Sequence, residues 1–229
     1  MQRSFVVEFA GTRGVGKSTL AAEVANALRK RGQPCNQRTP SGLPGKLAVW
    51  LRGHVSLVGG LWRIAGLRRL SWADLLRTAR AYRSVRRRLE RARKAPGVQV
   101  LEDGFFHLSA RVHMMTSHDH VALAATCETL LRDLPLPDLV VFVEASKETI
   151  EARRRMRGRP RDLLYRHVPP VAVRTMSELQ AVCARLATRS PGLGLITVVN
   201  EEPNALDDTA ARIADLILEK SRTLSQAAG

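Results

Sequence analysis

The sequence predicts an α/β fold, a three-layer sandwich in which helices cover both faces of a five-stranded parallel sheet. Two observations support this prediction. Five short apolar runs recur along the 229 residues, and segments with helical periodicity separate them. The first run does not alternate between apolar and polar residues, so we expect that strand to be buried on both sides. The predicted strands are residues 4–10, 34–38, 98–101, 138–144 and 194–200.

Helical periodicity fills the segments between these strands. In the first segment, Leu20, Val24 and Leu28 repeat every four residues and predict one core-facing stripe. Gly32 is placed to end that helix, and Ser71 is the expected N-cap of a later one. The predicted helices are residues 17–31, 43–52, 57–70 (or a loop with a helical end), 72–95, 105–115, 119–131, 146–161, 171–188 and 205–218.

The length and the 45% hydrophobic content suit one domain with a sizeable core. We expect this domain to span residues 1–222 and the tail, residues 223–229, to fray. Within the domain we expect a helical insertion at about residues 43–95 and an arginine-rich lid at about residues 153–170. No apolar run reaches the length of a membrane span, and we see no signal peptide before the first strand.

The three cysteines, Cys35, Cys127 and Cys183, lie far apart and match no metal or redox spacing. They indicate reduced, buried thiols in a cytoplasmic protein. Four histidines lie between His107 and His120, but further ligands with a matching spacing are missing. We therefore expect loop and helix-surface histidines there rather than a metal site.

The net charge of +16 is concentrated in one stretch of the chain. Between Lys46 and Ala95 there are fourteen basic residues and two acids. This excess indicates a polyanionic neighbour, such as a phosphorylated substrate, a nucleic acid, or an acidic protein or membrane surface. The alternative is a solvated arginine-rich helix face. All three tryptophans fall in the same region. We expect them to be core residues, and the alternative role is a stacking platform for a base.

A phosphate-binding loop follows the first strand. The pattern G-x-x-x-x-G-K-[ST] between a strand and a helix turns backbone N–H groups around phosphate oxygens, and the helix N-terminus faces the same anion. Lys17 supplies a positive charge for the outer phosphates, and the hydroxyl of Ser18 can bind Mg²⁺. The nucleotide-binding residues are therefore Gly11, Thr12, Arg13, Gly14, Val15, Gly16, Lys17, Ser18 and Thr19.

Other polar residues follow the remaining strands, at the edge where an open parallel sheet binds its ligands. They are Arg38, the pair Glu102 and Asp103, and Asn200. One carboxylate of the pair is expected to orient an acceptor hydroxyl or to hold Mg²⁺, since phosphoryl transfer depends on positioning and charge neutralisation. Asp103, next to Gly104, is the first choice as the catalytic residue. Both carboxylates remain metal-ligand candidates, and a helix cap is the alternative role for Asp103.

An arginine cluster follows the fourth strand. On a mobile lid it could close over the transferring phosphate and exclude water. The alternative is a solvated basic helix end. We assign catalytic roles to Arg153 and Arg157 within this cluster, whose members are Arg153, Arg154, Arg155, Arg157, Arg159 and Arg161.

Taken together, these motifs resemble the thymidylate kinases and related P-loop nucleoside and nucleotide kinases. The resemblance implies ATP and Mg²⁺ as cofactors and a sheet in the order 2-3-1-4-5. It implies that Arg38 binds the acceptor's phosphate and that Asn200 lies near the adenine. An arginine that the family has after its carboxylate is absent here, and Thr39 replaces a glutamate. The matching segments are residues 5–32, 37–42, 102–104, 144–146, 151–161 and 200–203.

We therefore predict an ATP- and Mg²⁺-dependent kinase that phosphorylates a nucleoside, a nucleotide or another small acceptor. The alternative is a nucleotide-binding ATPase or regulatory protein that has no acceptor. In one form of this alternative the protein acts together with nucleic acid. The departures in the acceptor motifs support that alternative, and the basic stretch between Lys46 and Ala95 supports a link to nucleic acid. A small anionic or nucleoside-like acceptor is the favoured partner, and a homodimer is compatible with the sequence.

Overall fold

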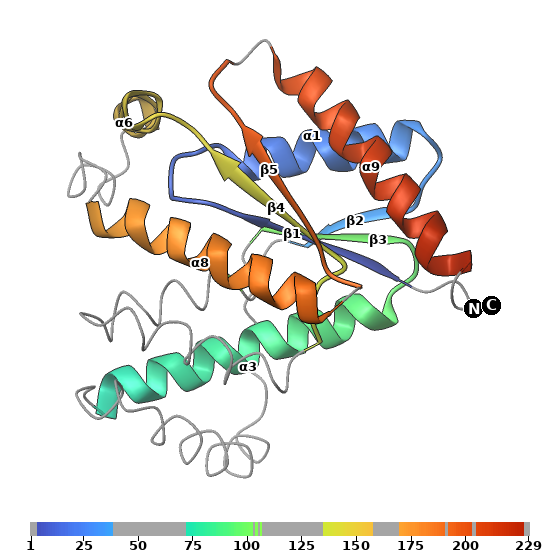
Figure 1. The fold of residues 1–229 in the computed structure, drawn as a ribbon, viewed down its shortest axis with the longest axis horizontal. Helices are drawn as coiled ribbons and strands as arrows, with labels where there is room; N and C mark the ends of the chain where they lie inside the picture. Colours follow the sequence, from blue (N-terminus) through green and yellow to red (C-terminus); the bar gives the residue numbers. More distant parts are fainter. Residues whose placement is uncertain are drawn as a thin grey trace.

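The computed structural model describes residues 4–38, 72–102, 104, 106, 135–157, 170–190, 192–202 and 205–226. These residues form a five-stranded parallel sheet in the order β2-β3-β1-β4-β5, which confirms the predicted topology (Figure 1). Each strand lies within two residues of its predicted bounds. The strands are β1 (Phe5–Ala10), β2 (Cys35–Arg38), β3 (Val98–Leu101), β4 (Leu139–Glu144) and β5 (Gly194–Val199).

Helices cover both faces of the sheet, as the three-layer prediction requires. Helices α1 and α9 cover one face, and α3 and α8 cover the other (Figure 1). The described helices are α1 (Lys17–Lys30), α3 (Trp72–Lys94), α6 (Lys147–Arg157), α8 (Pro170–Arg189) and α9 (Leu206–Gln226). Helix α9 continues eight residues beyond its predicted end, into the segment where we expected fraying. The predicted helices 43–52, 57–70 and 119–131 lie outside the described residues, and so does the predicted helix 105–115 apart from Phe106.

The core confirms the periodicity read from the sequence. Every residue of β1 is buried, as expected for a strand covered on both faces. Leu20, Val24 and Leu28 of α1 are fully buried against the sheet. Gly32 follows α1 with φ 74°, a left-handed conformation that glycine adopts without steric cost. On α8, Leu179, Val182 and Cys183 are buried on one side of the helix.

Cys35 and Cys183 are buried and not joined in a disulfide, whereas Cys127 lies outside the described residues. Burial raises the pKa of the Cys35 thiol to about 11, against a smaller lowering by Arg29, so this thiol stays protonated. None of the helices that the structure describes is both long enough and apolar enough to span a bilayer.

A buried carboxylate fixes the edge of the sheet opposite the phosphate-binding loop. Asp138 precedes β4 and is 2% exposed. Its Oδ2 accepts a hydrogen bond from the backbone N–H of Val6 at 2.7 Å and pairs with Nη1 of Arg93 at 2.5 Å. Arg93 also donates to the carbonyl of Leu136. Asp138 therefore ties β1, β4 and the end of α3 together.

We expect the substitution Asp138→Ala to lower the free energy of unfolding by about 3–5 kcal/mol, because it leaves a buried N–H and a guanidinium without their acceptor. Urea unfolding monitored by circular dichroism measures this loss. The matched control is Asp215→Ala, which breaks the surface pair between Arg31 and Asp215, 64% exposed, and should cost less than about 1 kcal/mol. Equal losses in both variants would contradict the role given to Asp138.

Candidate active site

The loop from Gly11 to Gly16 connects β1 to α1 and has the geometry of an anion-binding turn. Gly14 and Gly16 have φ values of 95° and 98°, which favour glycine. A Cβ at Gly11 would collide with the carbonyl of Val143, and one at Gly16 with the side-chain amide of Asn200. The glycines therefore meet a backbone requirement and a packing requirement together.

The first turn of α1 directly follows the glycine loop and faces the same anion-binding turn. Gly16 is the N-cap residue, and among the described residues no side chain caps this helix. Ser18 and Thr19 are exposed in this turn. A helix N-terminus leaves backbone N–H groups and a partial positive charge for an anion, and a hydroxyl in this turn can bind a divalent cation. The predicted phosphate-binding residues thus lie together, and the loop and helix end fit a nucleotide phosphate.

Lys17 is held at the mouth of this loop. Its ammonium group donates hydrogen bonds to the carbonyls of Gly11 at 2.8 Å and Thr12 at 2.9 Å. The side chain is half-buried, so these bonds orient it over the loop rather than in bulk water. Lys17 can therefore offer a positioned charge to phosphate oxygens there.

Helix α6 packs against the loop and braces it through hydrogen bonds to its backbone. Arg154 is 6% exposed and donates to the carbonyl of Arg13 from Nε at 3.0 Å and from Nη2 at 2.7 Å. A Cβ at Gly14 would lie 3.1 Å from atoms of Arg154 and Ile150, so the loop packs tightly against this helix. The sequence placed Arg154 in a phosphate-binding cluster, and the structure shows its guanidinium bound to loop backbone.

Arg153 and Asn200 both bind the carbonyl of Val15 in the loop. Arg153 Nη1 donates to the carbonyls of Val15 at 3.0 Å and Asn200 at 2.9 Å. The side-chain amide of Asn200 donates to the same Val15 carbonyl at 2.9 Å. Predicted residues from three separate segments are thus brought together beside the loop. Arg157, in contrast, is exposed at the last residue of α6. The catalytic roles of Arg153 and Arg157 remain predictions.

The start of α6 is joined to the segment after β5. Ser146 Oγ accepts the backbone N–H of Thr149 at 3.2 Å, so Ser146 is the N-cap of α6. Glu201 accepts hydrogen bonds from the hydroxyls of Thr149 at 2.6 Å and Ser146 at 2.9 Å, and from the N–H of Ser146. These bonds, the one from Thr149 foremost, lower the pKa of Glu201. The segment beside Asn200 is thereby fixed to the helix that braces the loop.

The ends of β2 and β3 form the other half of the site. Arg38 is in register with Leu101, and Leu101 is in register with Glu8 of β1. Gln37 Nε2 donates to Glu102 Oε1 at 2.8 Å, so the two strand ends are bridged. Asp103 lies outside the described residues, although Glu102 and Gly104 on either side of it are described. The choice between Glu102 and Asp103 as the working carboxylate therefore stays open.

Glu8 is a site residue that the sequence reasoning missed. It is fully buried, and its Oε1 accepts the backbone N–H of Phe106 at 2.8 Å. A Cβ on Gly104 would collide with the same carboxylate. The Phe106 ring packs against Phe142 of β4, with centroids 6.0 Å apart. Glu8 thus binds the backbone at Phe106 and lies against Gly104, directly after the predicted carboxylates.

The signal for Glu8 was present in the sequence, since it is the one acid within the apolar run 5–10. A buried carboxylate needs partners, so an acid in a fully buried strand marks a polar contact. Among the described residues, no group of three or more His, Cys, Asp or Glu side chains could hold a metal ion. His118 and His120 lie outside the described residues. A Mg²⁺ ion bound by Ser18 would therefore need further ligands, which nucleotide phosphates can supply.

We expect Gly104→Ala to lower the free energy of unfolding by about 1–3 kcal/mol, because the new methyl group overlaps the Glu8 carboxylate. In a Glu8→Ala background the same change should cost less than about 1 kcal/mol, since the overlapping group is gone. Urea unfolding of the four proteins measures this coupling. Gly192→Ala is the control, because a Cβ there would have no neighbour within 4 Å. An equal cost of Gly104→Ala in both backgrounds would show that the two residues do not interact.

We expect Arg154→Met to lower the free energy of unfolding by about 1.5–3 kcal/mol, because the aliphatic stem remains while the carbonyl of Arg13 loses charged donors. Arg155→Met is the matched control, since the next residue of the same helix is exposed. Thermal unfolding of both variants by calorimetry tests this difference. Equal unfolding temperatures of the two variants would show that the hydrogen bonds from Arg154 to the loop contribute nothing to stability.

Comparisons with known proteins agree with this fold. No family model and no curated protein matches the chain. A solved structure of deoxyadenosine kinase from M. mycoides, with products dCMP and a flexible dCDP bound, has 14% sequence identity and a TM-score of 0.51. The match covers 94% of this chain and 100% of that one. A second structure of deoxyadenosine kinase from M. mycoides, with bound dCTP, has 12% identity and a TM-score of 0.49, over 92% and 99% of the two chains. The chain therefore shares the α/β fold of a deoxynucleoside kinase structure.

Proposed function

We propose that this protein is an ATP- and Mg²⁺-dependent kinase that phosphorylates a nucleoside, a nucleotide or a related small acceptor. The observation that supports this most is the braced phosphate loop. Its glycine turns, the open end of α1 and the ammonium group of Lys17 converge at one place beyond β1. Such a convergence suits the phosphates of a nucleoside triphosphate.

On the donor side, the loop amides and Lys17 hold the phosphates, and Ser18 binds Mg²⁺. When bound, the metal neutralises charge on the outer phosphates. Asn200 borders the nucleotide base, and the support for this role is that its amide binds the Val15 carbonyl of the loop. Arg153 and Arg157 act on the transferring group, with a lid over residues 153–170. The support for this assignment is that α6 carries both arginines and contacts the loop directly.

On the acceptor side, Arg38 binds an anionic group, and Glu102 or Asp103 orients the acceptor hydroxyl or the metal. The register of β2, β3 and β1 supports a shared site, because Arg38, Leu101 and Glu8 lie in one row across the sheet. The substrate class follows the fold match to a deoxyadenosine kinase, which favours a nucleoside-like acceptor. A thymidylate kinase-like preference is a narrower version of the same proposal.

We expect Lys17→Ala to reduce phosphoryl transfer by at least about 100-fold while the fold stays intact, because the positioned charge is lost where negative charge must be stabilised. The measurement is ATP consumption with a panel of nucleosides, nucleoside monophosphates and phosphorylated metabolites. Lys30→Ala, an exposed position at the other end of α1, is the control and should retain full activity.

The same panel separates the kinase from the alternative ATPase. ATP consumption that rises with one class of acceptor, with a phosphorylated product detected by mass spectrometry, supports the kinase. Hydrolysis at one rate regardless of acceptor would favour the ATPase. Full activity of the Lys17→Ala variant would exclude both assignments of the loop.

A further inference from the structure

Five basic residues of α3 lie in one row along the helix, which we call the basic stripe. Its members are Arg80, Arg83, Arg87, Arg91 and Lys94. With 3.6 residues per turn, these positions fall within about 80° of one another on the helix circumference. Arg80, Arg91 and Lys94 are exposed, and Arg83 and Arg87 are half-buried. The stripe is about 21 Å long, because its ends are fourteen residues apart.

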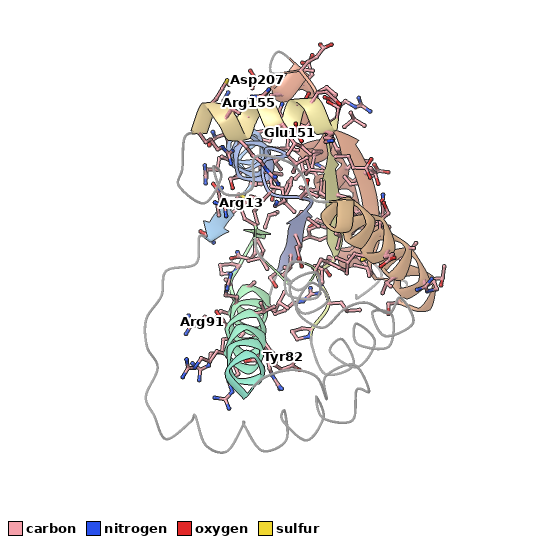
Figure 2. All side chains as sticks on the ribbon, turned by 90° about the vertical axis from the view of Figure 1, so that its left-hand side faces the viewer. Arg13, Tyr82, Arg91, Glu151, Arg155 and Asp207 are labelled. Atoms are coloured by element: carbon pink, nitrogen blue, oxygen red, sulfur yellow. The ribbon has the colours of Figure 1, made fainter. Side chains whose placement is uncertain are left out.

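The opposite side of α3 attaches the helix to the protein. Tyr82, Val85, Leu89 and Ala92 are buried there. Their mean direction lies about 180° from that of the stripe. Figure 2 shows Arg91 and Tyr82 on opposite sides of α3. The basic stripe therefore faces away from the core by the geometry of the helix.

Two basic residues of α3 outside the stripe are paired with acids. Arg86 pairs with Glu90 at 2.8 Å, and Arg93 pairs with the buried Asp138. Between Arg80 and Lys94 there are eight basic residues and one acid, so Glu90 is the one available internal counter-charge on this part of the helix. Burial and the neighbouring Arg87 lower the pKa of Arg83, a sign of repulsion along the stripe. A polyanion bound along α3 would relieve this repulsion.

The stripe leads away from the candidate active site. The phosphate loop lies at the carboxyl ends of the strands, whereas the end of α3 is fixed at their amino ends. There, Ser4 Oγ donates to the carbonyl of Arg93 at 2.8 Å, and Arg93 binds Asp138 directly before β4. A small acceptor held at the carboxyl ends could not contact cations along the whole 21 Å. The stripe thus fits an elongated, regularly charged partner.

We propose that the basic stripe binds the phosphate backbone of a nucleic acid. Four of its five cations are arginines, whose guanidinium groups form paired hydrogen bonds with phosphate oxygens. Its length spans about six phosphates of one strand of a duplex. A membrane surface is a poorer partner, because in the described part of the chain the large exposed apolar side chains, Met156, Val199 and Leu216, lie outside α3. Contacts to phosphates alone predict binding without sequence preference.

The test measures fluorescence anisotropy of a labelled 20-nucleotide single-stranded DNA with the full chain, between 50 and 300 mM salt, chosen as about the range in which phosphate contacts dominate. If all five cations contact phosphates, log Kd should change with log salt with a slope of about 3.5. The triple variant Arg83→Gln, Arg87→Gln and Arg91→Gln should reduce the slope by about 2 and weaken binding at least about tenfold at the lowest salt.

The matched control removes the same charge from the other face of the sheet. The triple variant Lys30→Gln, Arg212→Gln and Arg222→Gln changes exposed positions of α1 and α9 and should bind like the unaltered protein. No binding at 50 mM salt, or equal weakening in both triple variants, would overturn the proposal, as would binding to phosphatidylserine vesicles but not to DNA. Thermal unfolding confirms that the variants are folded. None of these readouts depends on kinase activity.

Discussion

The phosphate loop depends on where its carbonyl groups point. A loop that turns its N–H groups toward an anion must turn its carbonyls elsewhere, and buried carbonyls need donors. Here Arg154 binds the carbonyl of Arg13, and Arg153 and Asn200 bind that of Val15. Lys17 binds the carbonyls of Gly11 and Thr12 at the start of the loop. The anion-binding shape is therefore set before any ligand arrives, which lowers the ordering cost of binding.

At the ends of β2 and β3, in the other half of the candidate site, the group that binds backbone carries the opposite charge. A carboxylate, Glu8, lies inside the protein and takes the backbone N–H of Phe106, while Gly104 allows the chain to pass close by. The buried acid is tolerated because it is hydrogen-bonded. In both halves of the candidate site, ionisable side chains thus bind backbone groups of the neighbouring segments.

Positive charge is concentrated at two separate places on the molecule, the phosphate loop and helix α3. At the carboxyl edge of the sheet it is focused on a small, braced loop that suits a nucleotide. Along α3 it is spread over about 21 Å on the outward side of a helix whose other side is buried. Asp138 belongs to neither place. It pairs with Arg93 of α3 and so fixes the end of this helix at the amino edge of the sheet. The two proposed ligands, a nucleotide and a nucleic acid, thus fall at separate places on one basic chain.

Much of the fold was determined by the sequence alone, because its signals are local. The apolar run at residues 98–101, the four-residue repeat of α1 and the glycines of the phosphate loop each act over a few residues. The N-cap Ser146 was predictable for the same reason, as its partner is three residues away. The sheet order came from the family resemblance and was confirmed by strand pairing.

Only the tertiary structure decided which polar side chains support the site. Arg154 binds a carbonyl 141 positions earlier, Asn200 one that is 185 positions earlier, and Glu8 an N–H that is 98 positions later. No periodicity encodes such distances, because they depend on which strands become neighbours in the sheet. The adjacent arginines of α6 show the same limit. One is buried against the loop and the next is exposed, since successive helical residues point about 100° apart.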